Sequence, residues 1–349
     1  MLKKIALILF VFMILYYPPF FTIKGLRILT LISWILLLIN INGLSKSINL
    51  TEIIKVIFAG LFVILYIVFI GLLHQNDIIP SIAGFIYCYI AILPASILVA
   101  YTLKSMQYDI YDFVTIILKS GMLQSIVSLS SLLIPTVKSI LITGMLKGHV
   151  FQETTYTHAL TLRMFGYSTG LTYGMPIVQT FLAMAALYLA FEKKLGYMLY
   201  IPFLLASAFI NSRTSAIVAM VCLSVLLIIR KRKITSKVLF RRIIIVVGII
   251  AIIILLPRII SLVSPETYKW VQTGYNEIFR FVKGDTSSGY FNYLVDIKRW
   301  EVPKNLSLLF GTGIRIMSGN NQYNIQSDIG YINDLWLGGI FLTICTYFF

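Results

Sequence analysis

Long apolar runs separated by short polar segments are the feature that most limits what this chain can fold into. Many of the runs reach 16 residues or more, and only 12% of the residues are charged, about half of the roughly 25% typical of a soluble domain. Lipid-facing backbone must form its own hydrogen bonds, and the runs lack the roughly ten-residue alternation of barrel strands. We therefore predict an all-α, polytopic membrane helical bundle, with residues 1–349 forming a single integral membrane domain.

The apolar runs indicate about ten transmembrane helices, because each is near the roughly 20 residues that one crossing needs. The basic N-terminus resembles a signal peptide, but no small-residue cleavage pattern follows it, so we expect a retained first helix. The expected spans are 5–21, 26–41, 53–73, 81–103, 113–135, 175–191, 195–210, 214–229, 243–263 and 329–349.

Basic residues predict the orientation of the chain. Lys3 and Lys4 precede the first run, and the segment "RKRKITSKVLFRR", residues 230–242, carries seven basic residues and no acid. Cytoplasmic loops are enriched in Lys and Arg, so we expect the N-terminus and 230–242 to be cytoplasmic. Two long loops, approximately 136–174 and 264–328, are then external. The predicted location is a bacterial cytoplasmic (inner) membrane, with the active face external or periplasmic.

The net charge of +16 needs no nucleic-acid partner, because topology and contact with anionic membrane lipid explain the cytoplasmic share. The three cysteines show no CxxC spacing, and the chain has no HExxH, GxSxG or phosphate-binding P-loop motif. No metal site and no cofactor is therefore expected.

The first external loop is polar and rich in aromatic residues, among them Tyr167, which offer faces for sugar stacking. His158 titrates near neutral pH, and Glu153 would act as a base if its pKa were raised. The more common arrangement for His158 is a loop histidine packed on the bundle. In the second loop, "SSGYFNYLVDIKRWEVP", residues 287–303, is compatible with an amphipathic helix at the membrane interface. Asp328 suits the N-cap of the last helix.

Three segments resemble the superfamily of O-antigen polymerases and ligases. "NSRTSAI" is similar to the family's Ser-Arg turn between consecutive spans, and "RMFGYSTGLTYG" to its external Arg and Gly motif. "DIKRWEVPKNLSLLFGTG" followed by "SDIGYINDLWLGGI" resembles its closing pattern. A second Arg and Gly motif, which would run from Arg299 to Gly311, departs from the family pattern in the spacing of the two residues. The second loop holds no histidine, which favours the polymerase branch over the ligase branch.

The resemblance implies a metal-independent membrane glycosyltransferase, a polymerase whose donor and acceptor are both undecaprenyl-pyrophosphate-linked glycans. A chain-length regulator and a flippase are the protein partners that it suggests. Arg213 would bind the pyrophosphate, with Arg163 and Arg299 closing over it. Glu153, His158 and Asp328 stay open as the general base. Expected substrate contacts are Arg315, Tyr167, Gly174, Gly311, Gly313 and Tyr331, of which the two glycines 311 and 313 resemble a phosphate-cradling turn only loosely.

A flippase or other transporter of lipid-linked sugars is the main non-enzyme alternative, because a basic cavity above a bundle also suits such cargo. No internal repeat of the kind common in transporters is evident. An O-antigen ligase is a third possibility. A membrane sensor fits less well, because the cytoplasmic connections are too short for an output domain.

Overall fold

The computed structural model describes most of the 349 residues, and all of the described ones lie in helices, turns or irregular segments. The described residues are 2–18, 25–76, 79–147, 163–168, 174–212, 215, 218–219, 221–222, 247–248, 255–285, 296–316 and 330–348. None of them is in a β-strand, so the all-α prediction is confirmed for this part of the chain.

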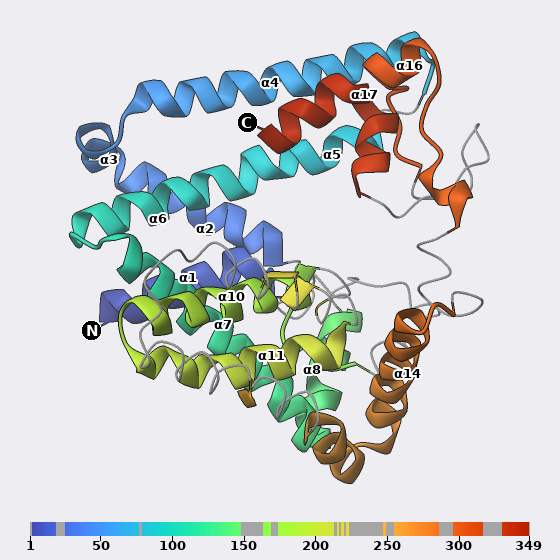
Figure 1. The fold of residues 1–349 in the computed structure, drawn as a ribbon. Coiled ribbons are helices and arrows are strands. Elements are labelled where there is room, and N and C mark those ends of the chain that lie inside the picture. The colour runs from blue at the N-terminus through green and yellow to red at the C-terminus, as the bar shows by residue number, and fades with distance from the viewer. Residues whose placement is uncertain are drawn as a thin grey trace, which may run out of the picture. The chain divides into compact units, whose positions relative to one another are not determined.

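Apart from the short α16, twelve α-helices are found among the described residues, and Figure 1 shows their arrangement. They are α1 (Leu2–Tyr16), α2 (Gly25–Ile39), α3 (Ile41–Ser47), α4 (Leu50–Leu73), α5 (Ile79–Tyr87), α6 (Leu93–Ser105), α7 (Ile110–Leu133), α8 (Pro135–Lys147), α10 (Gly174–Glu192), α11 (Tyr200–Asn211), α14 (Pro265–Val282) and α17 (Gly330–Phe348). Shorter elements are the π-helix η1 (Cys88–Ile92), the 3₁₀ turns η2 (Leu195–Leu199) and η3 (Ile297–Trp300), and the single turn α16 (Leu306–Phe310).

Four helical stretches among the described residues are long and apolar enough to cross a membrane. They are Thr51–Leu73, Phe85–Ser105, Ile110–Leu133 and Gly174–Glu192. The pair α2 and α3, bent by 79°, would make a fifth, and Leu195–Asn211 and Ile332–Cys345 are shorter apolar helices. A membrane protein is thus supported, whereas the count of ten spans stays a prediction. The expected spans 214–229 and 243–263 lie largely outside the described residues.

The two long loops contain helices that the sequence analysis did not place. Helix α8 occupies the start of the first, and its first residue is Pro135, a favoured position for proline. The amphipathic helix of the second loop is α14, not the segment 287–303, of which the described part holds only the 3₁₀ turn η3. Helix α14 was missed because it contains no long apolar run, although Tyr268, Val271 and Tyr275 recur at helical spacing along one face.

The chain divides into two compact units, each built from two separate stretches. Unit 1 comprises 1–32 and 98–276, and unit 2 comprises 33–97 and 277–349. In unit 1, α10 and α11 pack side by side against α7, and the fully buried Leu187 and Leu204 lie in their shared core (Figure 1).

Helix α7 contributes a buried polar face to unit 1. It carries Ser120, Gln124, Ser125, Ser128 and Ser131, all of them buried. Small and polar side chains are typical of close helix contacts in membranes, where hydrogen bonds between helices replace water. This face therefore fixes the loop that follows α8, as the bonds described below show.

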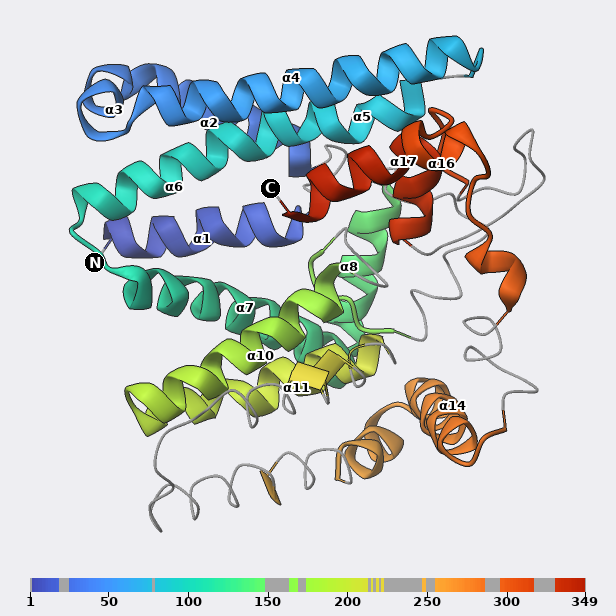
Figure 2. The same ribbon diagram turned by 45° about the horizontal axis from the view of Figure 1, so that its top comes forward.

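Unit 2 is organised around α4, which packs against α5 and α17 (Figure 2). The Tyr66 hydroxyl is within hydrogen-bond distance of the carbonyl oxygens of Phe310, at 3.0 Å, and Gly338, at 3.2 Å. Helix α17 is kinked at Gly339, where φ is 68°. Only glycine adopts this conformation without strain, so the kink is fixed by the sequence.

Candidate functional site

The described end of the first long loop, residues 163–168, is held on unit 1 by a buried amide. Asn211, the last residue of α11, accepts a hydrogen bond from the Met164 N–H at 2.7 Å through Oδ1. Its Nδ2 donates to the carbonyl oxygens of Met164 and Ser207, each at 2.7 Å. One side chain thereby satisfies both backbone groups of the residue that follows Arg163.

Helix α7 holds the same loop from a second direction. Gln124 donates from Nε2 to the Phe165 carbonyl at 2.6 Å and accepts the Tyr167 N–H at 3.3 Å, while Ser128 donates to the Met164 carbonyl. Gly166 between them has φ of 62°, and a Cβ there would lie 2.7 Å from the Gln124 amide. The loop can pass this close to α7 only with glycine at position 166.

Arg163 lies over an aromatic surface. Its guanidinium carbon is 4.0 Å from the ring centroid of Trp270, on α14, and 5.8 Å from that of Phe165. A guanidinium stacked on a Trp face is stabilised by the ring quadrupole and keeps its N–H edges available for hydrogen bonds in the plane of the group. The stacking orients the arginine.

A second cation, Lys138 of α8, shares a small cavity with Arg163. The cavity measures about 20 Å³ and is lined by both cations together with Ser131, Met164 and Phe165, among others. Room for about one water-sized group is available in such a volume. A single anionic oxygen would fit between the two cations, whereas a whole pyrophosphate would have to lie outside.

Burial shapes the protonation of groups in and around this site. It lowers the pKa of the Lys138 ammonium, while the nearby Glu266 carboxylate acts in the opposite direction. Burial also raises the pKa of Tyr167, and that of Tyr275 to about 12. Both phenols are therefore neutral hydrogen-bond donors at physiological pH. Two cations and neutral phenol donors, with the Glu266 carboxylate near Lys138, are thus found around this site.

Four of the proposed reactive residues cannot be placed. Arg213, Glu153, His158 and Asp328 lie outside the described residues. Of the other positions proposed to bind substrate, Gly174 is the exposed first residue of α10, and Tyr331 belongs to the first turn of α17.

Two of the selected arginines, Arg299 and Arg315, belong to unit 2 and each lies near an aspartate. Arg299 Nε is 3.8 Å from an Asp296 carboxylate oxygen, and Arg315 donates to Asp334 at 3.4 Å. Arg315 is also 6.0 Å from the ring centroid of Phe85. An anionic ligand at either arginine would have to compete with these carboxylates.

The turn that contains Gly311 and Gly313 is a packing element. Its N–H groups already donate to carbonyl oxygens, that of Thr312 to Trp336 at 2.7 Å and that of Gly313 to Leu337 at 3.0 Å. The Gly311 N–H donates to Ser307 at 2.8 Å. These bonds fix the turn on α17 and leave none of the three N–H groups directed at a phosphate, which argues against the phosphate-cradling interpretation.

Gly313→Ala is expected to destabilise the protein by more than the strain of its backbone conformation alone. The φ of Gly313 is 80°, and an added Cβ would lie 2.4 Å from the Gly71 Cα. Gly284 has a similar φ of 81° but no atom within 4 Å of an added Cβ. Gly284→Ala should therefore cost only about 1 kcal/mol. A clearly larger fall in unfolding temperature for Gly313→Ala, measured in detergent, would confirm the close approach, and equal falls would refute it.

Sequence reasoning missed the residues that position Arg163. Gln124 and Ser128 belong to the polar face of α7, Asn211 begins the "NSRT" segment, and Trp270 lies in a helix that was not expected. An amide within an apolar stretch was the one available signal, because such a group needs hydrogen-bond partners when buried. It identifies a polar contact but not the partner.

No three His, Cys, Asp or Glu side chains come together as a potential metal site within the described ranges. Comparison with known proteins finds no matching family model, no matching curated protein and no matching solved structure.

Proposed function

We propose that the protein is a membrane glycosyltransferase that joins undecaprenyl-pyrophosphate-linked oligosaccharide units into a surface polysaccharide at the external membrane face. One observation carries the proposal. Two segments that resemble the O-antigen polymerase pattern, far apart in the sequence, are bonded to each other through Asn211 and Met164. Asn211 opens the "NSRTSAI" segment, and Met164 is the second residue of "RMFGYSTGLTYG".

The proposed reaction transfers a growing glycan between lipid carriers. An acceptor hydroxyl oxygen forms a bond to the anomeric carbon of the donor sugar, and the bond from that carbon to the pyrophosphate oxygen breaks. The pyrophosphate leaves with the bonding electron pair, and a general base takes the hydroxyl proton. Both demands, an anion-stabilising group and a base, are typical of such transfers.

Arg163 is the described residue that best fits the leaving group. Its guanidinium stacks on Trp270, and Lys138 adds a second positive charge at the same cavity. Arg213, two positions after Asn211, is the proposed partner from the adjoining segment. Glu153, His158 and Asp328 stay candidates for the base, Arg299 stays a proposed partner at the pyrophosphate, and Arg315 a proposed substrate contact.

Deletion of the gene, followed by gel analysis of surface polysaccharide length, tests this function. Loss of a polymerase leaves single repeat units on the surface acceptor, and the wild-type gene restores the long ladder. If no repeat units reach the acceptor, the protein is a flippase. Long glycan that accumulates on the lipid carrier identifies a ligase instead.

A further inference from the structure

Unit 2 contains an apolar cavity of about 640 Å³ that the proposed reaction does not use. It lies among the bent pair α2 and α3, the first half of α4, and the continuous stretch α5, η1 and α6. Its wall includes Trp34, Leu44, Ile57 and Tyr89, and Ser45 is the one serine among its lining residues. An apolar cavity of about 150 Å³ already holds a benzene-sized ligand, and ligand sites typically measure about 300–1,000 Å³.

Two irregularities of the helices shape this cavity. The first is the 79° bend between α2 and α3, where Asn40 donates from Nδ2 to the Leu36 carbonyl at 2.8 Å. The second is the π-helical turn η1, in which the Ile90 carbonyl accepts the indole N–H of Trp34 at 2.9 Å. Both distorted backbones are thus supported by side-chain hydrogen bonds, so the cavity wall is a defined part of the fold.

The depth of the cavity matches one leaflet of a bilayer. Its lining residues on α4 run from Ile53 to Ile64, a rise of about 16 Å at 1.5 Å per residue. Half of the roughly 30 Å hydrocarbon core is about 15 Å. An acyl chain that ends at the bilayer midplane fits this depth, whereas a long isoprenoid chain would extend past it.

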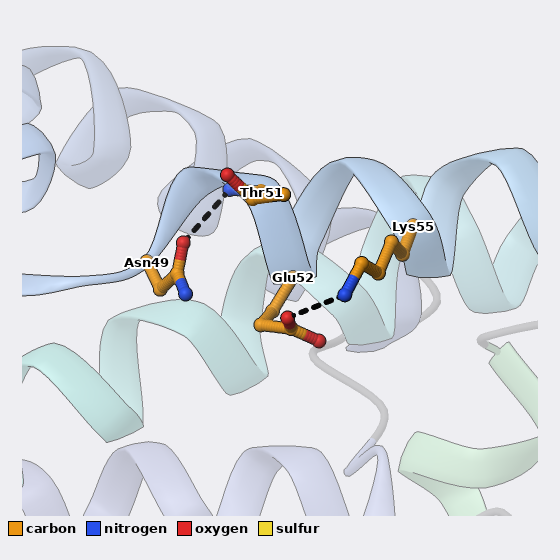
Figure 3. A network of polar contacts seen from close by, with 4 residues as sticks. All are labelled: Asn49, Thr51, Glu52 and Lys55. Atoms are coloured by element: carbon orange, nitrogen blue, oxygen red, sulfur yellow. Dashed lines mark hydrogen bonds and ion pairs between the residues drawn. The ribbon is translucent and has the colours of Figure 1, made fainter.

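Helix α3, at one end of the cavity, carries a positively charged lysine. Lys46 is exposed and follows Ser45, and within the described residues it has no ion-pair partner. The other nearby cation, Lys55, is bonded to Glu52 at 2.8 Å, next to the Asn49 cap of the Thr51 N–H (Figure 3). Lys55 is also two residues from Ile57, so it lies about 200° away around the helix from that lining residue.

We propose that this cavity binds one acyl chain of an anionic phospholipid, whose headgroup phosphate lies at Lys46. The chain fills the space between the bent pair and α4, and the exposed ammonium compensates the phosphate. The site is independent of glycan transfer, because it uses none of the residues assigned to that reaction.

The chain-binding part is tested by adding bulk inside and outside the cavity. Ile57→Trp fills it, whereas Ala59→Trp places the same side chain on an exposed position two residues away. Native mass spectrometry of detergent-purified protein, incubated with dioleoyl phosphatidylglycerol, should show one retained lipid for wild type and Ala59→Trp. The lipid should be lost from Ile57→Trp. Equal lipid retention by the two tryptophan variants would overturn the proposal.

Substitution of exposed lysines tests the headgroup part of the proposal, because changes at exposed positions leave the folded core intact. In competition between phosphatidylglycerol and phosphatidylethanolamine, Lys46→Gln should reduce the preference for the anionic lipid about fivefold, the usual effect of one basic side chain at an anionic membrane. Lys55→Gln should leave it unchanged. An equal loss in both variants, or displacement of phosphatidylglycerol by undecaprenyl phosphate, would contradict the proposed occupant.

Discussion

Arg163→Ala is expected to lower polysaccharide chain extension by about 100-fold or more, the usual effect of removing one preorganised group that stabilises a developing anion. The variant removes the guanidinium that stacks at 4.0 Å on Trp270 and leaves the loop contacts of Met164 and Phe165 in place. The measurement is the length distribution of surface polysaccharide in a deletion strain that carries the variant, with membrane insertion checked by immunoblot.

Arg258→Ala is the matched control for this prediction. Arg258 is an exposed arginine on the helical stretch before α14, and no role in the reaction is proposed for it. Its removal should leave the ladder unchanged. Arg163→Lys separates charge from shape, because lysine keeps the charge but lacks the planar fork. A normal ladder from Arg163→Ala would exclude any role for this residue in stabilising the leaving group.

Asn211→Ala is expected to destabilise unit 1 by about 1–3 kcal/mol, the cost of leaving one buried backbone group without its partner. That group is the N–H of Met164, while the carbonyl oxygens of Ser207 and Met164 each lose one donor but keep another. The effect would be seen as a lower unfolding temperature in detergent. Chain extension should fall as well, because the loop that carries Arg163 is no longer fixed.

Asn40→Ala is the control variant for Asn211→Ala. Asn40 makes a similar bond to a carbonyl four residues earlier, but it is an exposed contact in unit 2. Water can replace that bond, so the change in unfolding temperature should be small. If both asparagine variants shift the unfolding temperature equally, the buried amide does not hold the loop as inferred.

Helix positions were the part of the fold most accessible from sequence. Apolar runs predicted a helix over 175–191 and another over 53–73, and the structure has Gly174–Glu192 and Leu50–Leu73. Hydrophobicity determines these helices directly, because membrane insertion depends on it. Helix α14 is not identified by overall hydrophobicity in this way. Its apolar residues recur at helical spacing rather than in one long run, and they pack against residues of α11 and the helical stretch before α14, so a search for apolar runs does not find it.

The candidate site was only partly accessible, because a residue type does not reveal its partners. Arg163 was selected from its motif, but its stacking on Trp270 depends on packing between segments more than a hundred residues apart. Lys138 was not selected as a site residue, and the cavity that it shares with Arg163 was not foreseen. The Gly311 and Gly313 pattern suggested a phosphate turn, because sequence shows that a backbone can bend but not where its N–H groups point.

The discontinuity of unit 2 sets the order in which it can assemble during synthesis. Its first stretch, 33–97, leaves the ribosome before all of 98–276, and its second stretch follows afterwards. The close approach of Gly71 and Gly313, and the bonds from residues 312 and 313 to α17, must therefore wait until the last described helix is inserted. Until then α4 lacks its α17 neighbour, and a ribosome stalled before α17 would leave that face open to lipid or quality-control factors.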